Sequence, residues 1–240
     1  MSAILRQMAE RHIVAMGGGG FLRNDGDTLL DDFVLGLTGK PVPRVCYLGT
    51  AMGDEPGGIA LFHRCFPPER AHATHLNLFW QDGRDIRGFL TAQDVVYVGG
   101  GNTVNMLAVW RAHSVDDALR QAWEAGVILC GMSAGSLCWF EAGITDSYGP
   151  LRGLRDGLGL LPGSNCPHYD GEAQRRPTYH REIAAGLPAG FAADDFCGLH
   201  FAGTELVEAV SSQAGAGAYR VELADGVVRE TPMGARYLGA

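Results

Sequence analysis

Short apolar runs alternate with segments of helical periodicity through the first two thirds of the chain. The apolar runs predict strands at residues 12–16, 44–48, 72–78, 94–98 and 127–130. The segments between them repeat apolar residues every three or four positions. They predict helices near residues 27–36, 59–65, 103–113 and 115–125, the third of them capped by Asn102. Strands that are apolar throughout and are separated by helices indicate a parallel sheet that is covered on both faces.

The C-terminal part follows a different pattern. Residues 198–201, 205–210, 218–223 and 227–230 are typical of short antiparallel strands, joined by turns such as Asp225-Gly226. No internal repeat or low-complexity linker divides the chain. The sequence therefore predicts one α/β domain over residues 1–240. We expect a three-layer sandwich with a mainly parallel central sheet and a short antiparallel C-terminal part.

Composition narrows the choice of partners. The net charge of −8, the pI near 5.4 and the single lysine, Lys40, give no basic footprint for a nucleic acid. No stretch approaches the roughly 20 apolar residues of a membrane span, and residues 1–11 lack the apolar core of a secretory signal. The six cysteines form no CxxC pair, and several lie inside apolar runs. We therefore expect a cytoplasmic protein with structural thiols and no membrane partner.

The strongest chemical signal is the pentapeptide Gly131-Met-Ser133-Ala-Gly135. It lies between the apolar run 127–130 and residues 136–140, which are expected to be helical. A serine on such a strand-to-helix turn is raised above the sheet, and its neighbours must be small because the backbone is crowded. Free amides at the helix start then favour a developing anion. The motif predicts a nucleophilic Ser133; the alternative is a glycine-rich turn with a capping serine.

A serine nucleophile needs a base, and eight histidines are available. Most of them fall inside predicted elements, where a structural role is the simpler interpretation. His168 differs, because it follows a proline within residues 163–171, an irregular segment rich in turn formers. His180, on a helical stretch, and His200, within a strand, are weaker candidates. The sequence therefore favours His168 as the general base.

Three carboxylates could orient that histidine. Glu141 is expected at the end of the helix that follows Ser133, Asp146 in the loop after it, and Asp195 at the entrance to a C-terminal strand. Each could equally be a turn or capping acid. The residues alone leave this choice open.

Two glycine clusters follow predicted strands. Residues 17–20 lack the spacing of a dinucleotide fingerprint, and no phosphate-binding loop motif is present. Residues 99–101 lie at the carboxyl edge of the sheet, where the Gly101 amide could complete an oxyanion hole with that of Ala134. No HExxH or comparable spacing suggests a metal. We expect neither a cofactor nor a metal ion.

Three motifs in order resemble the peptidase E family, which includes aspartyl dipeptidases and cyanophycinases. They are residues 98–103 (VGGGNT), 131–135 (GMSAG) and 165–169 (NCPHY), and the similarity extends from about His12 to the C-terminal strands. The resemblance implies a fold like that of class I glutamine amidotransferase domains, with serine in place of the usual cysteine. It also implies a peptide hydrolase that uses no metal or cofactor, and a homodimer is plausible from the resemblance alone.

The resemblance assigns Ser133 as nucleophile, His168 as base, and Gly101 and Ala134 as oxyanion donors. For the acid it offers two matches. The aspartyl dipeptidases use an Asp shortly after the nucleophile helix, for which Asp146 is the nearest match, although with a gap. The cyanophycinases use a Glu after the histidine, whose place falls on Asp195 without a gap, and Asp195 is slightly favoured.

In the aspartyl dipeptidases an arginine downstream of the histidine pairs with the aspartate side chain of the substrate. Arg175 and Arg176 lie in the corresponding stretch, and Arg176 is the closer match; the alternative is a surface pair at a helix start. Together these features predict a dipeptidase that acts on small peptides. A preference for substrates with an N-terminal Asp is one hypothesis. A cyanophycinase-like or carboxyl-end peptidase, and a non-catalytic module that binds a small amino-acid ligand, remain alternatives.

Overall fold

The computed structural model describes residues 11–23 and 26–240. Its larger sheet has the strand order β14-β11-β10-β1-β5-β4-β2-β3. The parallel part contains β1 (His12–Met16), β5 (Ile128–Met132), β4 (Val95–Val98), β2 (Arg44–Leu48) and β3 (His72–Leu76). On the other side of β1 the sheet continues with β10 (Cys197–Ala202), β11 (Glu205–Ser211) and β14 (Ala235–Tyr237), and β10 is antiparallel to both of its neighbours.

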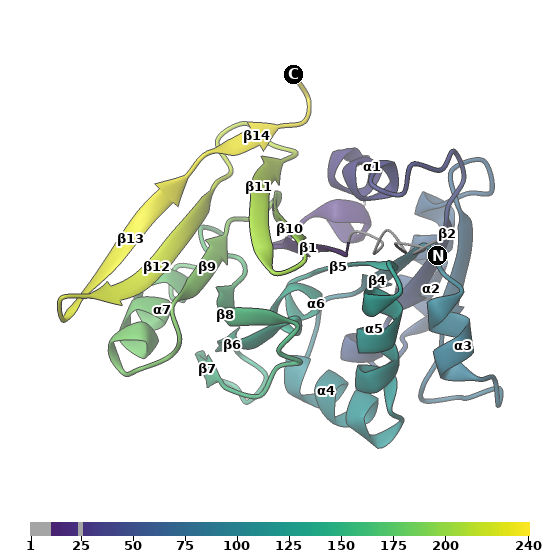
Figure 1. Cartoon of the computed structure of the whole chain (residues 1–240), viewed down its shortest axis with the longest axis horizontal. Coiled ribbons are helices and arrows are strands. Elements are labelled where there is room, and N and C mark those ends of the chain that lie inside the picture. Colours follow the sequence, from purple (N-terminus) through teal and green to yellow (C-terminus); the bar gives the residue numbers. More distant parts are fainter. Residues whose placement is uncertain (1–10, 24–25) are drawn as a thin grey trace, which may run out of the picture.

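Helices cover both faces of this sheet (Figure 1). Along β1, Ile13 and Ala15 belong to one core cluster and Val14 and Met16 to the other, so successive side chains are buried on opposite faces. The first cluster is covered by α3 (Ile86–Thr91), α4 (Thr103–Ala112) and α5 (Val115–Glu124). The second is covered by η1 (Gly20–Arg23), α1 (Leu29–Gly36) and α2 (Pro56–Cys65), and a short turn η2 (Thr50–Met52) follows β2. Burial on both faces explains why these strands are apolar throughout.

A second sheet contains most of the remaining chain, in the order β13-β12-β9-β8-β6-β7. Its strands are β6 (Phe140–Thr145), β7 (Arg152–Leu154), β8 (Leu161–Cys166), β9 (Gly190–Ala193), β12 (Ala218–Ala224) and β13 (Val227–Met233). Strands β6, β8 and β9 are parallel to one another, and the others pair antiparallel. Helix α7 (Arg175–Ala184) packs on this sheet, at the opposite end of the molecule from α2 and α3 (Figure 1).

The α/β class, the parallel core and the antiparallel C-terminal strands are confirmed. Two expectations were wrong. The helix after Ser133 is a single turn, α6 (Ala134–Leu137), and Phe140 already begins β6. The segment before His168 is strand β8, not an irregular loop. An apolar run such as residues 136–140 fits either a helix or a strand, and its complete burial between the two sheets decides the outcome.

Candidate active site

Ser133 lies on a sharp turn between β5 and α6, with φ 56° and ψ −115°. Both motif glycines face the Val98 carbonyl of the neighbouring strand. A Cβ atom would stand 2.6 Å from that oxygen at Gly131 and 2.3 Å from it at Gly135. Side chains at either position would push β4 away from β5. This crowding is the physical reason for small residues around a serine raised above the sheet edge.

The glycine loop after β4 runs beside the serine. A Cβ atom on Gly100 would be 3.3 Å from the Ser133 Cβ and 3.8 Å from its hydroxyl oxygen. Gly101 has φ 131°, and a Cβ there would stand 2.4 Å from the Ala51 carbonyl oxygen, so this position requires glycine. Ala134 is the first residue of α6, and its amide has no carbonyl of its own helix to bond. The glycine loop after β4 and the first residue of α6 therefore both border Ser133.

His168 follows the end of β8 and has φ 55°. Its Nδ1 is 2.6 Å from Oδ1 of Asp195, which lies in the turn between β9 and β10. An ionised carboxylate has no proton to give, so the ring donates from Nδ1 and keeps Nε2 as its acceptor. Both side chains are mostly buried, with exposed fractions of 23% and 18%. The arrangement is that of a histidine whose tautomer is fixed by an acid.

Close packing holds this pair in place. A Cβ atom on Gly18 would stand 2.0 Å from Asp195 Oδ1 and 3.1 Å from His168 Cε1, and one on Gly171 would stand 2.5 Å from Asp195 Oδ2. The Asp195 amide donates to Asp170 Oδ1 at 2.9 Å. Glycine is therefore needed on two sides of the carboxylate.

Ser133 and the His168–Asp195 pair border the same short segment after β1. The Ser133 amide donates to the Met16 carbonyl at 3.1 Å, and the next residue, Gly17, donates to the Cys197 carbonyl at 2.9 Å. Gly18 then forms a parallel bridge with Asp195. The segment thus connects the turn of the serine with the turn of the acid.

A buried amide gives a second connection, and the sequence did not reveal its role. Asn165, on β8, accepts a hydrogen bond from the Ser136 hydroxyl at 3.1 Å and donates to the Phe191 carbonyl at 3.4 Å. Asn165 is fully buried. It joins the helix that follows Ser133 to the strand that ends at His168, across the boundary between the two sheets.

The other two candidate acids lie elsewhere. Glu141 is an exposed residue of β6 whose carboxylate accepts from the Gly163 amide at 2.9 Å. Asp146 is exposed in the turn after β6, and Ser147 beside it accepts from Asn102 Nδ2 at the start of α4. The structure brings His168 together with Asp195 and not with either of these residues.

The two arginines have different environments. Arg175 is buried, forms an ion pair with Glu172 at 2.8 Å and donates to the Ile144 carbonyl, which indicates a structural role. Arg176 is 43% exposed and forms an ion pair with Glu230 of β13 at 3.0 Å. Its guanidinium lies over the ring of Tyr169, the residue after His168. Sequence reasoning missed Glu230, which lies in an ordinary edge strand.

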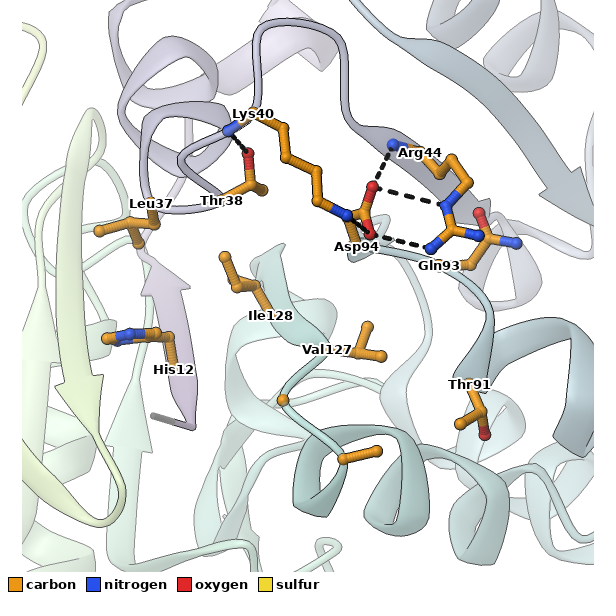
Figure 2. Close-up of a pocket in the computed structure, with 12 residues that line it drawn as sticks. His12, Leu37, Thr38, Lys40, Arg44, Thr91, Gln93, Asp94, Val127 and Ile128 are labelled. Carbon is orange, nitrogen blue, oxygen red and sulfur yellow. Dashed lines mark hydrogen bonds and ion pairs between the residues drawn. The ribbon is translucent and has the colours of Figure 1, made fainter. Parts of the chain in front are cut away.

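A cavity of about 510 Å³ lies at the opposite, amino-terminal edge of the parallel strands, lined by residues such as His12, Lys40, Arg44 and Asp94. Figure 2 shows Lys40 and Arg44 reaching Asp94 from two sides, with distances of 2.8 and 3.1 Å. The Asp94 carboxylate therefore has two cationic partners at this edge of the sheet. Among the described residues, no group of three or more His, Cys, Asp or Glu side chains could hold a metal ion. Within the same residues, no helix is long and apolar enough to cross a membrane.

Comparison with known proteins places the chain in a family. The profile of peptidase family S51 matches residues 13–209. The uncharacterized peptidase YgaJ of Bacillus subtilis (strain 168) is 46% identical over 230 residues, which cover 95% of this chain and 100% of the relative. A peptidase from an acI-B1 Actinobacterium shares the fold with a TM-score of 0.69 and 16% identity, over 95% and 96% of the two chains. A Listeria monocytogenes EGD-e protein described as a candidate peptidase E has a TM-score of 0.62 and 17% identity, over 85% of this chain and 100% of that one. The chain belongs to peptidase family S51 and is a serine-type peptidase.

Proposed function

We propose that this peptidase hydrolyses short peptides through an acyl-enzyme on Ser133, with His168 as general base and Asp195 as the acid that orients it. The observation that carries the proposal is the 2.6 Å contact between His168 Nδ1 and Asp195 Oδ1. It is supported by the strained turn at Ser133 and by the shared segment that borders both sites. Asp146 is not included, because it lies in an exposed turn.

In the proposed reaction, His168 Nε2 takes the hydroxyl proton of Ser133 as the serine oxygen bonds to the scissile carbonyl carbon. The amides of Gly101 and Ala134 hold the resulting oxyanion. The amine leaves with the proton from His168, and water releases the acyl group by the same steps with the roles reversed. Removing one such oxyanion donor typically raises the barrier by about 3 kcal/mol.

The expected substrates are dipeptides and other short peptides. A preference for N-terminal Asp is one hypothesis, in which Arg176 pairs with the aspartate side chain of the substrate. In the structure Arg176 is already paired with Glu230, so an acidic substrate would have to displace that contact.

The nucleophile is tested with Ser133→Ala, with Ser114→Ala as a matched control. Ser114 is an exposed serine between α4 and α5. The wild type and the control should react with a fluorophosphonate probe and cleave members of a dipeptide panel, because both keep the activated serine. Ser133→Ala should do neither, while its circular dichroism spectrum is unchanged. Labelling of the Ser133→Ala protein at wild-type level would overturn the assignment.

A further inference from the structure

We propose that Glu230 is a specificity-determining residue that withholds Arg176 from substrate carboxylates, so that the site accepts an uncharged side chain in place of aspartate. The inference rests on the proposed function, because it concerns peptides bound beside Ser133 and His168. It departs from the expectation that Arg176 selects an N-terminal Asp.

The Glu230 carboxylate is fully engaged from three directions. One oxygen lies 3.0 Å from Arg176 Nη1. The other accepts the Tyr169 hydroxyl at 2.6 Å and lies 2.8 Å from His180 Nε2. The side chain of Glu230 is only 16% exposed, so this is a partly desolvated contact in which charge-assisted hydrogen bonds are strong.

The arginine is also fixed in direction by two aromatic rings. Its guanidinium carbon is 4.6 Å from the centre of the Tyr169 ring and 4.8 Å from that of Tyr219. Stacking of this kind restricts a long side chain and adds a cation–π attraction. Arg176 is therefore ordered before any substrate binds, and its positive charge is already paired with the Glu230 carboxylate.

The same rings connect the arginine to the candidate catalytic pair. Tyr169 directly follows His168 and donates its amide to the Ala193 carbonyl at 3.1 Å. The Tyr219 hydroxyl donates to Asp194, the residue before Asp195, at 3.2 Å. Arg176 thus lies on side chains that flank His168 and Asp195, where it can influence which substrate side chain is tolerated.

An aspartate side chain would compete with a carboxylate of the protein itself. A tethered group acts at an effective concentration in the millimolar range or above, which a substrate at micromolar concentration does not match. Burial and the hydrogen bond to Glu230 also raise the pKa of Tyr169, so its hydroxyl remains a donor to that carboxylate. A substrate with an uncharged side chain meets no such competition, because it leaves the Arg176–Glu230 pair intact.

The test compares Asp-Leu with the nearly isosteric Asn-Leu in the wild type and in Glu230→Gln. The wild type should cleave Asn-Leu with the higher kcat/KM. In Glu230→Gln the ratio of kcat/KM for Asp-Leu over Asn-Leu should rise at least tenfold, because the guanidinium loses its internal partner. The double variant Arg176→Met, Glu230→Gln should lose that gain. Glu222→Gln is the matched control, since Glu222 lies on the neighbouring strand β12 and pairs with Arg220.

A binding measurement separates this inference from the proposed chemistry. Binding of Asp-Leu is measured by calorimetry in two proteins, Ser133→Ala and the double variant Ser133→Ala, Glu230→Gln. The double variant should bind Asp-Leu at least tenfold more tightly than Ser133→Ala alone. A wild type that prefers Asp-Leu, or a Glu230→Gln protein with unchanged discrimination and affinity, would overturn the inference. Failure of the proposed function would instead appear as absent fluorophosphonate labelling of the wild type. If Glu230→Gln does not fold, Glu230→Asp gives the same test, because the shorter side chain draws the carboxylate away from Arg176.

Discussion

Asp31 is a buried carboxyl group whose ionisation should control stability. It lies in α1 with 1% of its surface exposed, under the glycine segment that follows β1. Its Oδ1 accepts the Tyr97 hydroxyl at 2.8 Å, whereas Oδ2 is buried with no hydrogen-bond partner among the described residues. Burial raises the pKa of Asp31 from 3.8 to about 7, against the opposing effect of the Tyr97 hydrogen bond.

The sign and size of the effect follow from proton linkage. Between pH 3.8 and about 7 the unfolded chain has lost this proton and the folded chain still holds it, so the free energy of unfolding falls as the pH rises. The shift spans roughly three pKa units at 1.36 kcal/mol each, which amounts to about 4 kcal/mol. The full stabilisation is present below pH 3.8, and it is lost once the folded-state pKa has been passed.

Asp31→Asn should remove this dependence. Asparagine can still accept from Tyr97, but its amide donor would be buried without a partner, which costs about 1–3 kcal/mol at every pH. The variant should therefore be less stable than the wild type near pH 4 and at least as stable near pH 8. Urea unfolding at a series of pH values measures the difference, with the exposed Asp117→Asn as control. A free-energy difference between Asp31→Asn and wild type that does not change from pH 4 to pH 8 would refute the reasoning.

Two further predictions concern the candidate active site. Asp195→Asn keeps the size of the side chain but cannot hold the required tautomer of His168. We expect kcat to fall by about 10⁴ while the circular dichroism spectrum is unchanged. A fall in kcat of less than tenfold would exclude Asp195 as the orienting acid. Gly18→Ala would place a Cβ atom 2.0 Å from Asp195 Oδ1 and should displace the carboxylate. We expect kcat to fall by at least 10² while Gly36→Ala, at an exposed position of α1 with open space around it, retains activity in the same peptidase assay.

The parallel sheet could be predicted because its strands are buried on both faces and leave a continuous apolar signal, as in residues 95–98. The inner strands of the second sheet could not, although β12 and β13 match the strands predicted at residues 218–223 and 227–230. Strand β8 has the sequence LPGSNC, whose turn-forming residues indicate a loop. In the fold Gly163 has φ 86° and packs against the Ala189 carbonyl, and Ser164 bonds to Tyr179 at 2.7 Å. Polar residues can occupy this buried strand because distant partners satisfy them.

The site shows the same division between local and distant information. Ser133 and His168 stand in local motifs, so the sequence could mark both as candidates. Asp146 follows β6 and Asp195 follows β9, the two strands that pair with β8, so the choice between them depends on contacts between segments far apart in the sequence. Glu230 lies more than fifty residues from Arg176, and nothing in its own strand indicates a role. Residues whose function depends on a distant partner give no local signal.

Backbone strain gathers at the same place as the candidate chemistry. Of the six non-glycine residues with positive φ in residues 11–23 and 26–240, three are Ser133, His168 and Phe196, the residue after Asp195. Each such position costs about 1–3 kcal/mol and persists only where its surroundings determine the conformation. Here the amides of Ser133 and Phe196 donate to the carbonyls of Met16 and Gly18 at 3.1 Å each. The segment at the end of β1 therefore fixes the turns of both the serine and the acid, and it requires glycine because Cβ atoms on Gly17 and Gly18 would stand 2.2 Å from the Asp194 carbonyl oxygen and 2.0 Å from Asp195 Oδ1.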